Sequence, residues 1–194
     1  MAVDEKIKKI VGWLVGAKSV FFVTGAGISA DSGLPTYRGI GGLYNEAVTD
    51  EGIPIETALA GATIATRPEI TWKYLGEIEK KCRGAKFNRA HEVLALMEKR
   101  FQRTWVLTQN IDGLHRAAGS KNLIEIHGDF HKLLCPACGW KAVVQGYSKI
   151  NIPPLCPRCE HIVRPEVVFF GEQLPSRELS ILYEQLRKEW KTLS

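Results

Sequence analysis

Four of the five cysteines in the chain fall into two C-x2-C pairs, Cys135 with Cys138 and Cys156 with Cys159. The stretch between the pairs lies in the window of about 15 to 20 residues over which two turns present four thiolates to one zinc ion. Four thiolates complete the coordination shell, so the predicted zinc is structural and catalysis must lie elsewhere. The alternative, a reduced buried thiol, is our interpretation only for Cys82, which has no sequence partner.

A glycine-rich turn follows a continuous apolar run. Residues 25–30 have the sequence Gly-Ala-Gly-Ile-Ser-Ala and match the pattern GxGxx(G/A) directly after the predicted strand 19–24. In that context the missing side chains and free amides let a pyrophosphate approach the backbone. A simple tight turn is the alternative, and an ordinary dinucleotide-binding fold would also place an acid about 20 residues further on, after a second strand. Asp50 and Glu51 lie at that distance, but no predicted strand precedes them.

Polar side chains follow two other predicted strands. Asn110 and Asp112 come after the strand 104–108, and His127 comes after the strand 123–126. Ligands of open α/β sheets bind at this carboxyl edge, so we expect the three side chains to face the glycine turn. A neutral imidazole placed there can act as a general base. The alternatives are an Asx turn for Asp112 and a structural role for His127.

The predicted elements alternate between strands and helices, which indicates an α/β domain with a parallel sheet. The strand 19–24 is expected to be buried on both faces, and the first helix to bury the apolar face that begins at Ile7 and repeats at i+3, i+4 and i+7. The segment 25–45 is expected to be mostly loop. The other predicted helices lie at 72–80, from Asn88 to about Met97, at 113–118 and from Ser176 onward.

The composition is that of a globular protein, with 45% of the 194 residues hydrophobic and 24% charged. The net charge of +5 is too small for a dedicated nucleic-acid binder, so no direct contact with nucleic acid is expected. No apolar run reaches the roughly 18 residues that a membrane span needs, and the start of the chain is not built like a signal peptide. We therefore expect a cytoplasmic protein without a membrane contact.

Together these segments resemble the sirtuin family of NAD-dependent protein-lysine deacylases. The matching stretches occur in the order and at the spacing of that family, from about residue 18 to residue 172. Besides the four cysteines they are Gly-Ala-Gly-Ile-Ser-Ala-Asp-Ser-Gly-Leu-Pro-Thr-Tyr-Arg at 25–38, Thr-Gln-Asn-Ile-Asp at 108–112, His-Gly at 127–128 and Val-Val-Phe-Phe-Gly-Glu at 167–172. The resemblance covers most of the chain.

The resemblance implies NAD as cofactor and a role for each matching residue. The phosphates would lie against Gly25, Ala26, Gly27 and Ile28. The loop that covers the nicotinamide ribose would contain Thr36, Tyr37 and Arg38. The ribose and nicotinamide pocket would be formed by Gln109, Asn110, Ile111 and Asp112. The catalytic residues would be His127 as the base, with Asn110 and with Asp112 accepting a hydrogen bond from the carboxamide.

The same resemblance implies the reaction and the partner. In the chemistry of that family the acyl oxygen of an acyl-lysine displaces nicotinamide from the ribose, and His127 would remove a proton from a ribose hydroxyl. The products would be nicotinamide, free lysine and O-acyl-ADP-ribose. The partner would be an acyl-lysine protein or peptide whose backbone pairs as an added strand with Val167, Val168, Phe169, Phe170 and Gly171.

Thr36 and the stretch 39–43 resemble the subgroup of sirtuins that acts on acidic acyl groups such as succinyl. That subgroup binds the acyl carboxylate with a Tyr-x-x-Arg pair, where this chain has Tyr74 and Glu77. A carboxylate at position 77 would repel an acidic acyl group. The sequence therefore predicts that Tyr74 contacts substrate and that acetyl or another neutral acyl group is preferred.

The expected architecture is an α/β, Rossmann-like parallel sheet with a small inserted zinc-ribbon module. We expect residues 1–130 to form the first part of the NAD-binding core, 131–162 the zinc-binding module, and 163–194 the return to the core with the substrate strand and a final helix. Sirtuins continue with further strands and helices, which implies that the C-terminal part of the sheet is missing here. Three explanations are open: a fragment of a longer protein, which we favour, a truncated protein whose sheet is completed by a partner chain or an oligomer, or a reduced and inert domain. The isolated chain is expected to bind NAD poorly and to deacetylate weakly or not at all.

Other activities remain open at this point. NAD hydrolysis and mono-ADP-ribosyl transfer also begin with the departure of nicotinamide and would use the same pocket. An inactive zinc-ribbon module that contacts a partner through its basic surface is an alternative from another class. That alternative leaves His127 and the polar stretch 109–112 unexplained.

Overall fold

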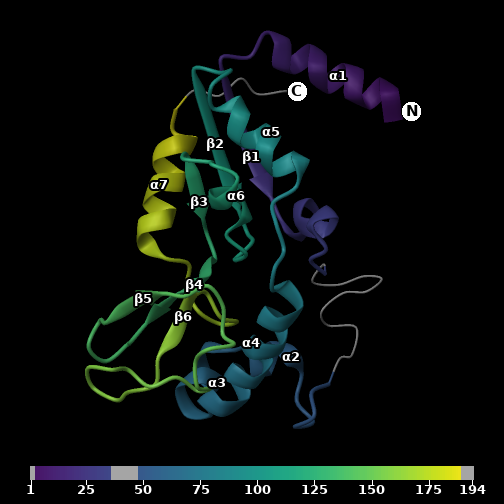
Figure 1. Cartoon of the computed structure of the whole chain (residues 1–194). Coiled ribbons are helices and arrows are strands. Elements are labelled where there is room, and N and C mark those ends of the chain that lie inside the picture. The colour runs from purple at the N-terminus through teal and green to yellow at the C-terminus, as the bar shows by residue number, and fades with distance from the viewer. Residues whose placement is uncertain (1–2, 36–47, 189–194) are drawn as a thin grey trace.

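The computed structural model describes residues 3–35 and 48–188. The predicted cofactor residues Thr36, Tyr37 and Arg38 and the stretch 39–43 lie outside these ranges. The described chain forms a sheet body around a parallel sheet (residues 3–35, 89–126 and 176–188) and a helix–ribbon module (residues 48–82 and 128–170), one below the other in Figure 1. None of the helices in these ranges is long and apolar enough to cross a membrane.

The sheet body is built on three parallel strands in the order β1-β2-β3. Their bounds are Ser19–Thr24 for β1, Arg103–Thr108 for β2 and Leu123–Glu125 for β3. Thr24 lies beside Thr108 and Thr108 beside Glu125, so the carboxyl ends of all three strands meet at one edge. The predicted parallel sheet is confirmed, and the polar residues that follow its strands come to one place.

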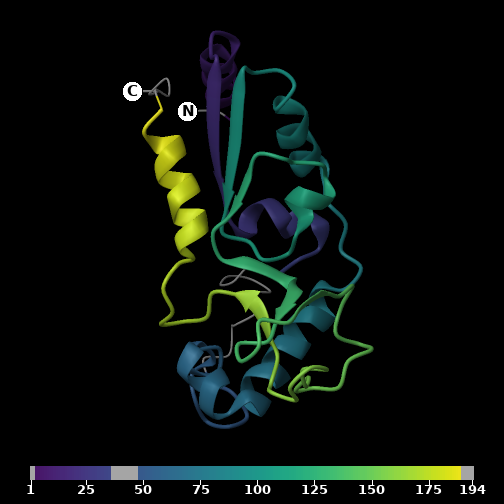
Figure 2. The same cartoon turned by 90° about the vertical axis from the view of Figure 1, so that its left-hand side faces the viewer.

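Helices cover both faces of this sheet (Figure 2). On one face lie α5 and α6, and on the other lies α7; their bounds are Arg89–Met97, Leu114–Ala117 and Ser176–Leu186. Asn88 caps α5 as predicted, because its side chain accepts a hydrogen bond from the amide of Ala90. Most of the predicted loop after β1 within the described part of the chain is a short 3-10 helix, η1, over Ala26–Ser32.

Two expectations about burial are wrong. Helix α1 (Val3–Val15) forms, but its apolar residues Ile7 and Ile10 are about half exposed, because α1 extends away from the sheet (Figure 1). Strand β1 is only partly buried along its length, and Val23 is 63% exposed. Among the described strands β1 pairs with β2 alone, so it is also an edge strand here.

The helix–ribbon module combines segments that are far apart in the sequence. Its helices are α2 (Ile55–Ala58), α3 (Gly61–Thr66) and α4 (Pro68–Cys82). Its antiparallel sheet has the order β5-β4-β6, with the strands β4 at Gly128–Leu134, β5 at Lys141–Val143 and β6 at Arg164–Val167. Proline at the first position of α4 suits a helix start, since a backbone N–H at this position would have no acceptor within the helix.

The main hydrophobic core lies in this module. Trp72 of α4 is fully buried and donates its indole N–H to the carbonyl of Val163 at 2.9 Å. Its ring meets that of Tyr147 edge-on at 5.2 Å, and the Tyr147 hydroxyl donates to the carbonyl of Phe130 at 2.6 Å. The helices of residues 55–82 therefore share one core with the cysteine-bearing segment. The predicted domain boundaries at 130 and 162 stay predictions.

Candidate active site and zinc centre

The glycine loop (residues 25–33) is tied to the segment after β2 by side-chain hydrogen bonds. Asn110 donates its Nδ2 to the carbonyl of Gly25 and to the hydroxyl of Ser29, both at 3.1 Å. Ser29 is buried and donates its own hydroxyl proton to Oδ2 of Asp112 at 2.7 Å. The carboxyl ends of β1 and β2 are thus joined through the predicted site residues themselves.

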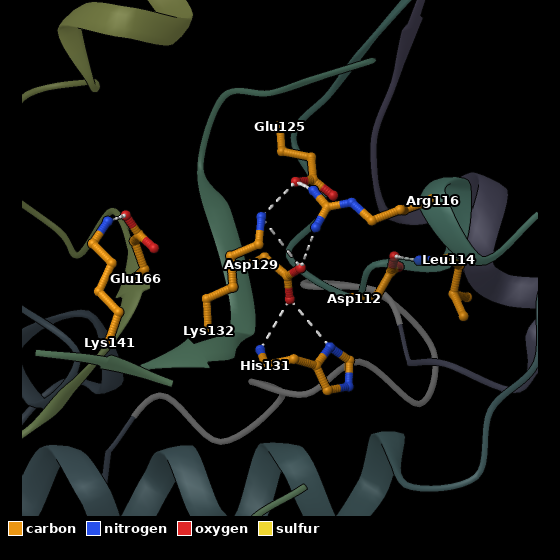
Figure 3. Close-up of polar contacts among 9 residues, drawn as sticks. All are labelled: Asp112, Leu114, Arg116, Glu125, Asp129, His131, Lys132, Lys141 and Glu166. Carbon is orange, nitrogen blue, oxygen red and sulfur yellow. Dashed lines mark hydrogen bonds and ion pairs between the residues drawn. The ribbon is translucent and has the colours of Figure 1, made fainter. Parts of the chain in front are cut away.

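Asp112 has a second hydrogen bond that serves the local backbone. Its Oδ1 accepts from the amide of Leu114 at 2.9 Å and so begins α6, as the contact in Figure 3 shows. The Asx turn that the sequence left as an alternative is therefore present, together with the bond to Ser29. Each carboxylate oxygen can accept more than one hydrogen bond, so both contacts leave capacity for a ligand donor.

His127 lies two residues after the end of β3 and is fixed by the backbone on two sides. Its Nδ1 lies 2.9 Å from the carbonyl oxygen of Gln109, and its own carbonyl accepts from the amide of Val168 at 3.0 Å. A carbonyl can only accept, so Nδ1 carries the proton and Nε2 of the neutral ring is left with a lone pair. The half-buried ring can therefore take a proton at Nε2.

The exposed part of the site is formed by the glycine loop and Gln109. Gly27 and Gln109 are exposed, while Gly25, Ala26 and Ile28 are half-buried. A Cβ atom at Gly25 would lie 3.7 Å from the side-chain nitrogen of Gln109. Gln109 hydrogen-bonds through its backbone to Thr24, which precedes Gly25, and to His127, and Asn110 hydrogen-bonds to Gly25, so the structure brings the predicted cofactor and base residues together.

Two buried histidines lie beneath the site, and the sequence did not point to them. The Nε2 of His115 is 2.9 Å from the hydroxyl of Thr24, at the end of β1. Burial lowers the pKa of His115 to about 4, and the neighbouring His91 ring, 4.8 Å away between centroids, lowers it further. Burial also lowers the pKa of His91. Both rings are neutral at neutral pH and serve as packing partners of the strand end.

Charged residues next to His127 form an ion cluster (Arg116, Glu125, Asp129, His131 and Lys132; Figure 3). Asp129 is buried, lies 3.2 Å from Nη1 of Arg116 and accepts from the backbone amide of His131 at 2.9 Å. Burial alone would raise the pKa of Asp129, but the hydrogen bonds from His131 and the charge of Lys132 hold it below its usual value. The cluster ties α6, which follows Asp112, to β4, which follows His127.

The predicted substrate residue Tyr74 lies in the helix–ribbon module. Its hydroxyl donates to Glu51 at 2.5 Å and accepts from the amide of Asp50 at 3.0 Å. Hydrogen bonds from Lys73 and from Tyr74 lower the pKa of Glu51 to about 2. Asp50 and Glu51, the two acids at the sequence distance expected for a ribose ligand, therefore bind to α4. The side chain of Glu77 is exposed.

The predicted substrate segment 167–171 continues from β6. Its buried side chains are Val167 and Phe169, which alternate with the more exposed Val168 and Phe170. The amides of residues 168, 169 and 170 already donate within the chain, to His127, Glu172 and Leu59 respectively. An added strand would have to use other backbone groups of this segment, while the outward side chains are placed to contact a ligand.

The four paired cysteines come together in the helix–ribbon module. All four sulfurs lie within 4.8 Å of one another, with Cys135 and Cys159 at 3.5 Å and Cys138 and Cys156 at 3.6 Å. Thiolates around tetrahedral zinc would be about 3.8 Å apart, given a zinc–sulfur bond of about 2.3 Å. The donor set and its spacing therefore fit zinc.

The two cysteine turns repeat each other in geometry. In each, the first cysteine donates its amide to the carbonyl five residues on, at 2.8 Å, and accepts from the amide four residues on. The fourth residue has a positive φ in both, 71° at Gly139 and 59° at Glu160. Burial alone would raise the pKa of Cys135, but the amides of Cys138 and Ala137 lower it below its usual value. The His161 backbone lowers the pKa of Cys159, but burial and the other three sulfurs raise it above its usual value, so zinc binding must displace a proton there.

A parallel α/β sheet with a glycine loop at its carboxyl edge and an inserted four-cysteine ribbon defines the Rossmann-like class with a structural zinc module. Within that class the chain belongs to the Sir2 family, whose sequence model matches residues 25–192. The predicted family and fold class and the two cofactors, NAD and zinc, are confirmed.

Similar proteins support the same assignment. The NAD-dependent protein deacylase 2 of Pseudomonas syringae pv. tomato is 50% identical over 173 residues, which cover 88% of this chain and 69% of that protein. The NAD-dependent protein deacylase 2 of Pseudomonas aeruginosa is 48% identical over 175 residues, covering 89% and 68%. This chain therefore spans about two thirds of the length of these relatives.

Solved Sir2 structures share the fold. A mutant Sir2 homologue in complex with ADP-ribose has a TM-score of 0.81 at 34% identity and covers 93% of this chain and 70% of its own. A Sir2 mutant with a deacetylated p53 peptide and 3'-O-acetyl ADP-ribose has a TM-score of 0.78 at 33% identity, with 90% and 69% covered.

Proposed function

We propose that this chain is an NAD-dependent protein-lysine deacetylase, which transfers the acyl group of an acyl-lysine to ADP-ribose and releases nicotinamide. The observation that carries this proposal is the position of His127. Its ring is held with a free Nε2 lone pair by the same segment that holds the glycine loop. NAD hydrolysis, mono-ADP-ribosyl transfer and an inactive binding module are not favoured, since the similar proteins are named deacylases.

Each group of site residues has a separate role in the proposed reaction. NAD supplies a ribose carbon from which nicotinamide can depart. The glycine loop, with Gly25, Ala26, Gly27 and Ile28, presents backbone to the phosphates, and its conformation is maintained by Asn110 and Ser29. Asp112 offers its remaining acceptor capacity to the carboxamide, beside Gln109 and Ile111. His127 accepts a ribose hydroxyl proton at Nε2. Thr36, Tyr37 and Arg38 are proposed to cover the ribose.

We propose an acyl-lysine peptide as the substrate, supported by the similarity to the peptide-bound Sir2 structure. The outward side chains of Val168 and Phe170 would contact the peptide, with Val167, Phe169 and Gly171 supporting its strand. Tyr74 contributes to substrate binding, and Glu77 disfavours an acidic acyl group, so acetyl-lysine is preferred over succinyl-lysine.

Zinc would be held by Cys135, Cys138, Cys156 and Cys159 as a structural ion. We also retain the division into an NAD-binding core (1–130), a zinc-binding module (131–162) and a returning segment (163–194). A cytoplasmic location, the absence of direct nucleic-acid binding and a partner chain or oligomer that completes the sheet stay predictions.

The test is product analysis by mass spectrometry, with the purified protein, NAD and matched acetyl-lysine and succinyl-lysine peptides. Because the isolated chain is predicted to bind NAD poorly, the expected result is a slow loss of acetyl from the peptide, with one O-acetyl-ADP-ribose formed for each nicotinamide released. The kcat/KM for the succinyl peptide should be lower still. Free ADP-ribose formed without deacetylation would instead identify an NAD hydrolase. ADP-ribose attached to protein would identify a transferase.

A further inference from the structure

Asn88 lies outside the set of residues that would contact the cofactor, yet its side chain reaches the glycine loop. With its Oδ1 it accepts from the amide of Ala90 at 3.0 Å and caps α5. With its Nδ2 it donates to the carbonyl of Ile28 at 2.7 Å and to the hydroxyl of Ser32 at 3.0 Å. One side chain thus joins the start of a helix to a loop 60 positions earlier in the sequence.

The orientation of this amide is determined by its partners. The Ala90 amide can only donate and the Ile28 carbonyl can only accept, so a flipped amide would lose both hydrogen bonds. His91, the third residue of α5, completes the cap through its ring and is fully buried against His115. The helix end that carries Asn88 is therefore anchored in the interior beneath the site.

The contacts of the glycine loop show what Asn88 adds. Asn110 holds the beginning of the loop through the Gly25 carbonyl, and Asp112 holds its middle through Ser29. Asn88 holds the loop on either side of Ser29, at Ile28 and at Ser32. The loop is a short 3-10 helix whose first residue has no side-chain cap, and such helices have weak hydrogen-bond geometry. Its conformation therefore depends on side chains from outside.

We propose that Asn88 is a positioning residue for cofactor binding, which fixes the glycine loop in the conformation that receives the phosphates of NAD. This inference rests on the proposed function, because it assumes that the loop binds NAD. Asn88 acts through the loop and does not touch the cofactor. When its Nδ2 contact is lost, the loop must be ordered at the moment of binding, which weakens NAD binding and leaves the later chemical step nearly unchanged.

Two substitutions separate the cap from the contact with the loop. Asn88→Ser keeps a good helix cap, since serine caps as well as asparagine, but it lacks the amide that reaches Ile28. Asn88→Ala loses both. We expect N88S to melt at a higher temperature than N88A, because it keeps the helix cap. It should raise the KM for NAD by roughly fivefold to tenfold, as for the loss of one net hydrogen bond, with little change in kcat.

Amide hydrogen exchange provides a measurement that needs no NAD. In N88S the amides of residues 26–32 should exchange faster, whereas those of α5 keep their protection; in N88A both segments should exchange faster. Ser32→Ala, which removes only the weaker acceptor, should give a smaller change in the loop and a smaller rise in KM. Unchanged loop exchange in N88S, or loop and helix always changing together, would overturn the proposal.

The two proposals fail in different ways. If the wild-type protein forms no O-acetyl-ADP-ribose, the proposed function fails, and with it the assumption that the loop binds NAD in this reaction. If the wild-type protein is active but N88S binds NAD as tightly as wild type while its loop exchanges faster, only the role of Asn88 in cofactor binding is overturned.

Discussion

At the scale of single residues, the tautomer of the His127 ring depends on one backbone carbonyl. Gln109 donates its amide to Thr24 at the end of β1 and accepts the Nδ1 proton of His127 with its carbonyl. The backbone of Gln109 therefore fixes the tautomer of the His127 ring and ties this ring to the end of β1. A base fixed in this way needs no carboxylate partner to present Nε2.

Substitution of His127 by Asn tests the role of Nε2. An Asn side chain can keep a donor to the Gln109 carbonyl but has no lone pair in place of Nε2. We expect kcat/KM for deacetylation to fall by about 10²- to 10⁴-fold, the usual contribution of a general base, with NAD affinity within about threefold. Steady-state kinetics and calorimetry check this, with the exposed His161→Ala as the control. Activity within tenfold of wild type would show that His127 is not the base.

His115 predicts a pH dependence of stability. Its pKa is about 4 in the folded chain and 6.5 when unperturbed, so the unfolded state binds more protons between these values. The contribution of His115 to the free energy of unfolding is fully present above pH 6.5 and is lost as the pH falls towards 4. Between pH 7 and pH 5 this loss is about 2 kcal/mol. Urea unfolding of wild type and His115→Gln should show a steeper pH dependence for wild type. Equal slopes would contradict a buried neutral imidazole.

At the scale of elements, the sequence predicts strands and their polar ends well. Short apolar runs bounded by glycine or polar residues indicated β1, β2 and β3, and the residues after them, Asn110, Asp112 and His127, do meet at one edge. This succeeds because parallel strands bring their carboxyl ends together whatever lies around them. The order and placement of the site residues therefore follow from local patterns.

Burial and long-range contacts could not be predicted in the same way. The spacing of Ile7 and Ile10 marks an apolar helix face, but periodicity does not say what covers it. Tyr74 was assigned from a motif position, whereas its hydroxyl partner Glu51 depends on how α4 packs. Ser29 and His115 act through partners 83 and 91 positions away, and no local signal in the sequence records such pairs.

The two cysteine turns offer a matched test of backbone strain. At Gly139 a Cβ atom would meet nothing within 4 Å, so Gly139→Ala would add only the strain of a positive φ, roughly 1–2 kcal/mol. Glu160 already has that strain, so Glu160→Gly should relieve it. Glycine has more conformational freedom in the unfolded chain, which offsets part of the gain, and the net stabilisation of the zinc-loaded chain should be about 0.5–1 kcal/mol. Thermal unfolding measures both; destabilisation by both substitutions would contradict the equivalence of the turns.

At the scale of the whole molecule, the proposed base His127 lies between the sheet body and the helix–ribbon module. His127 follows the last strand of the sheet body and precedes β4, the central strand of the helix–ribbon module. The amide of Phe130 donates to the carbonyl of Ile111, and the Arg116–Asp129 ion pair joins the same two segments (Figure 3). The position of the base therefore depends on the folding of the module.

Removal of zinc should consequently affect both the helix–ribbon module and the position of His127 next to the sheet body. Cys135 and Cys156 belong to the core cluster with Trp72, so loss of the ion leaves two unliganded thiols in that core. We expect chelation, or Cys138→Ser, to unfold the helix–ribbon module and to abolish deacetylation, although zinc takes no part in the chemistry. Metal analysis, near-ultraviolet circular dichroism and activity should be lost together. Full activity in a zinc-free protein would contradict this dependence.

Nuclear magnetic resonance of the His127 ring tests the central claim most directly. In the free protein, its long-range proton–nitrogen spectrum should show the proton on Nδ1 and an unprotonated Nε2 at neutral pH. Addition of NAD should shift both ring nitrogens and produce a proton–proton contact between the ring and the ribose next to the nicotinamide. A ring that keeps its resonances while those of the glycine loop move on NAD addition would contradict the account.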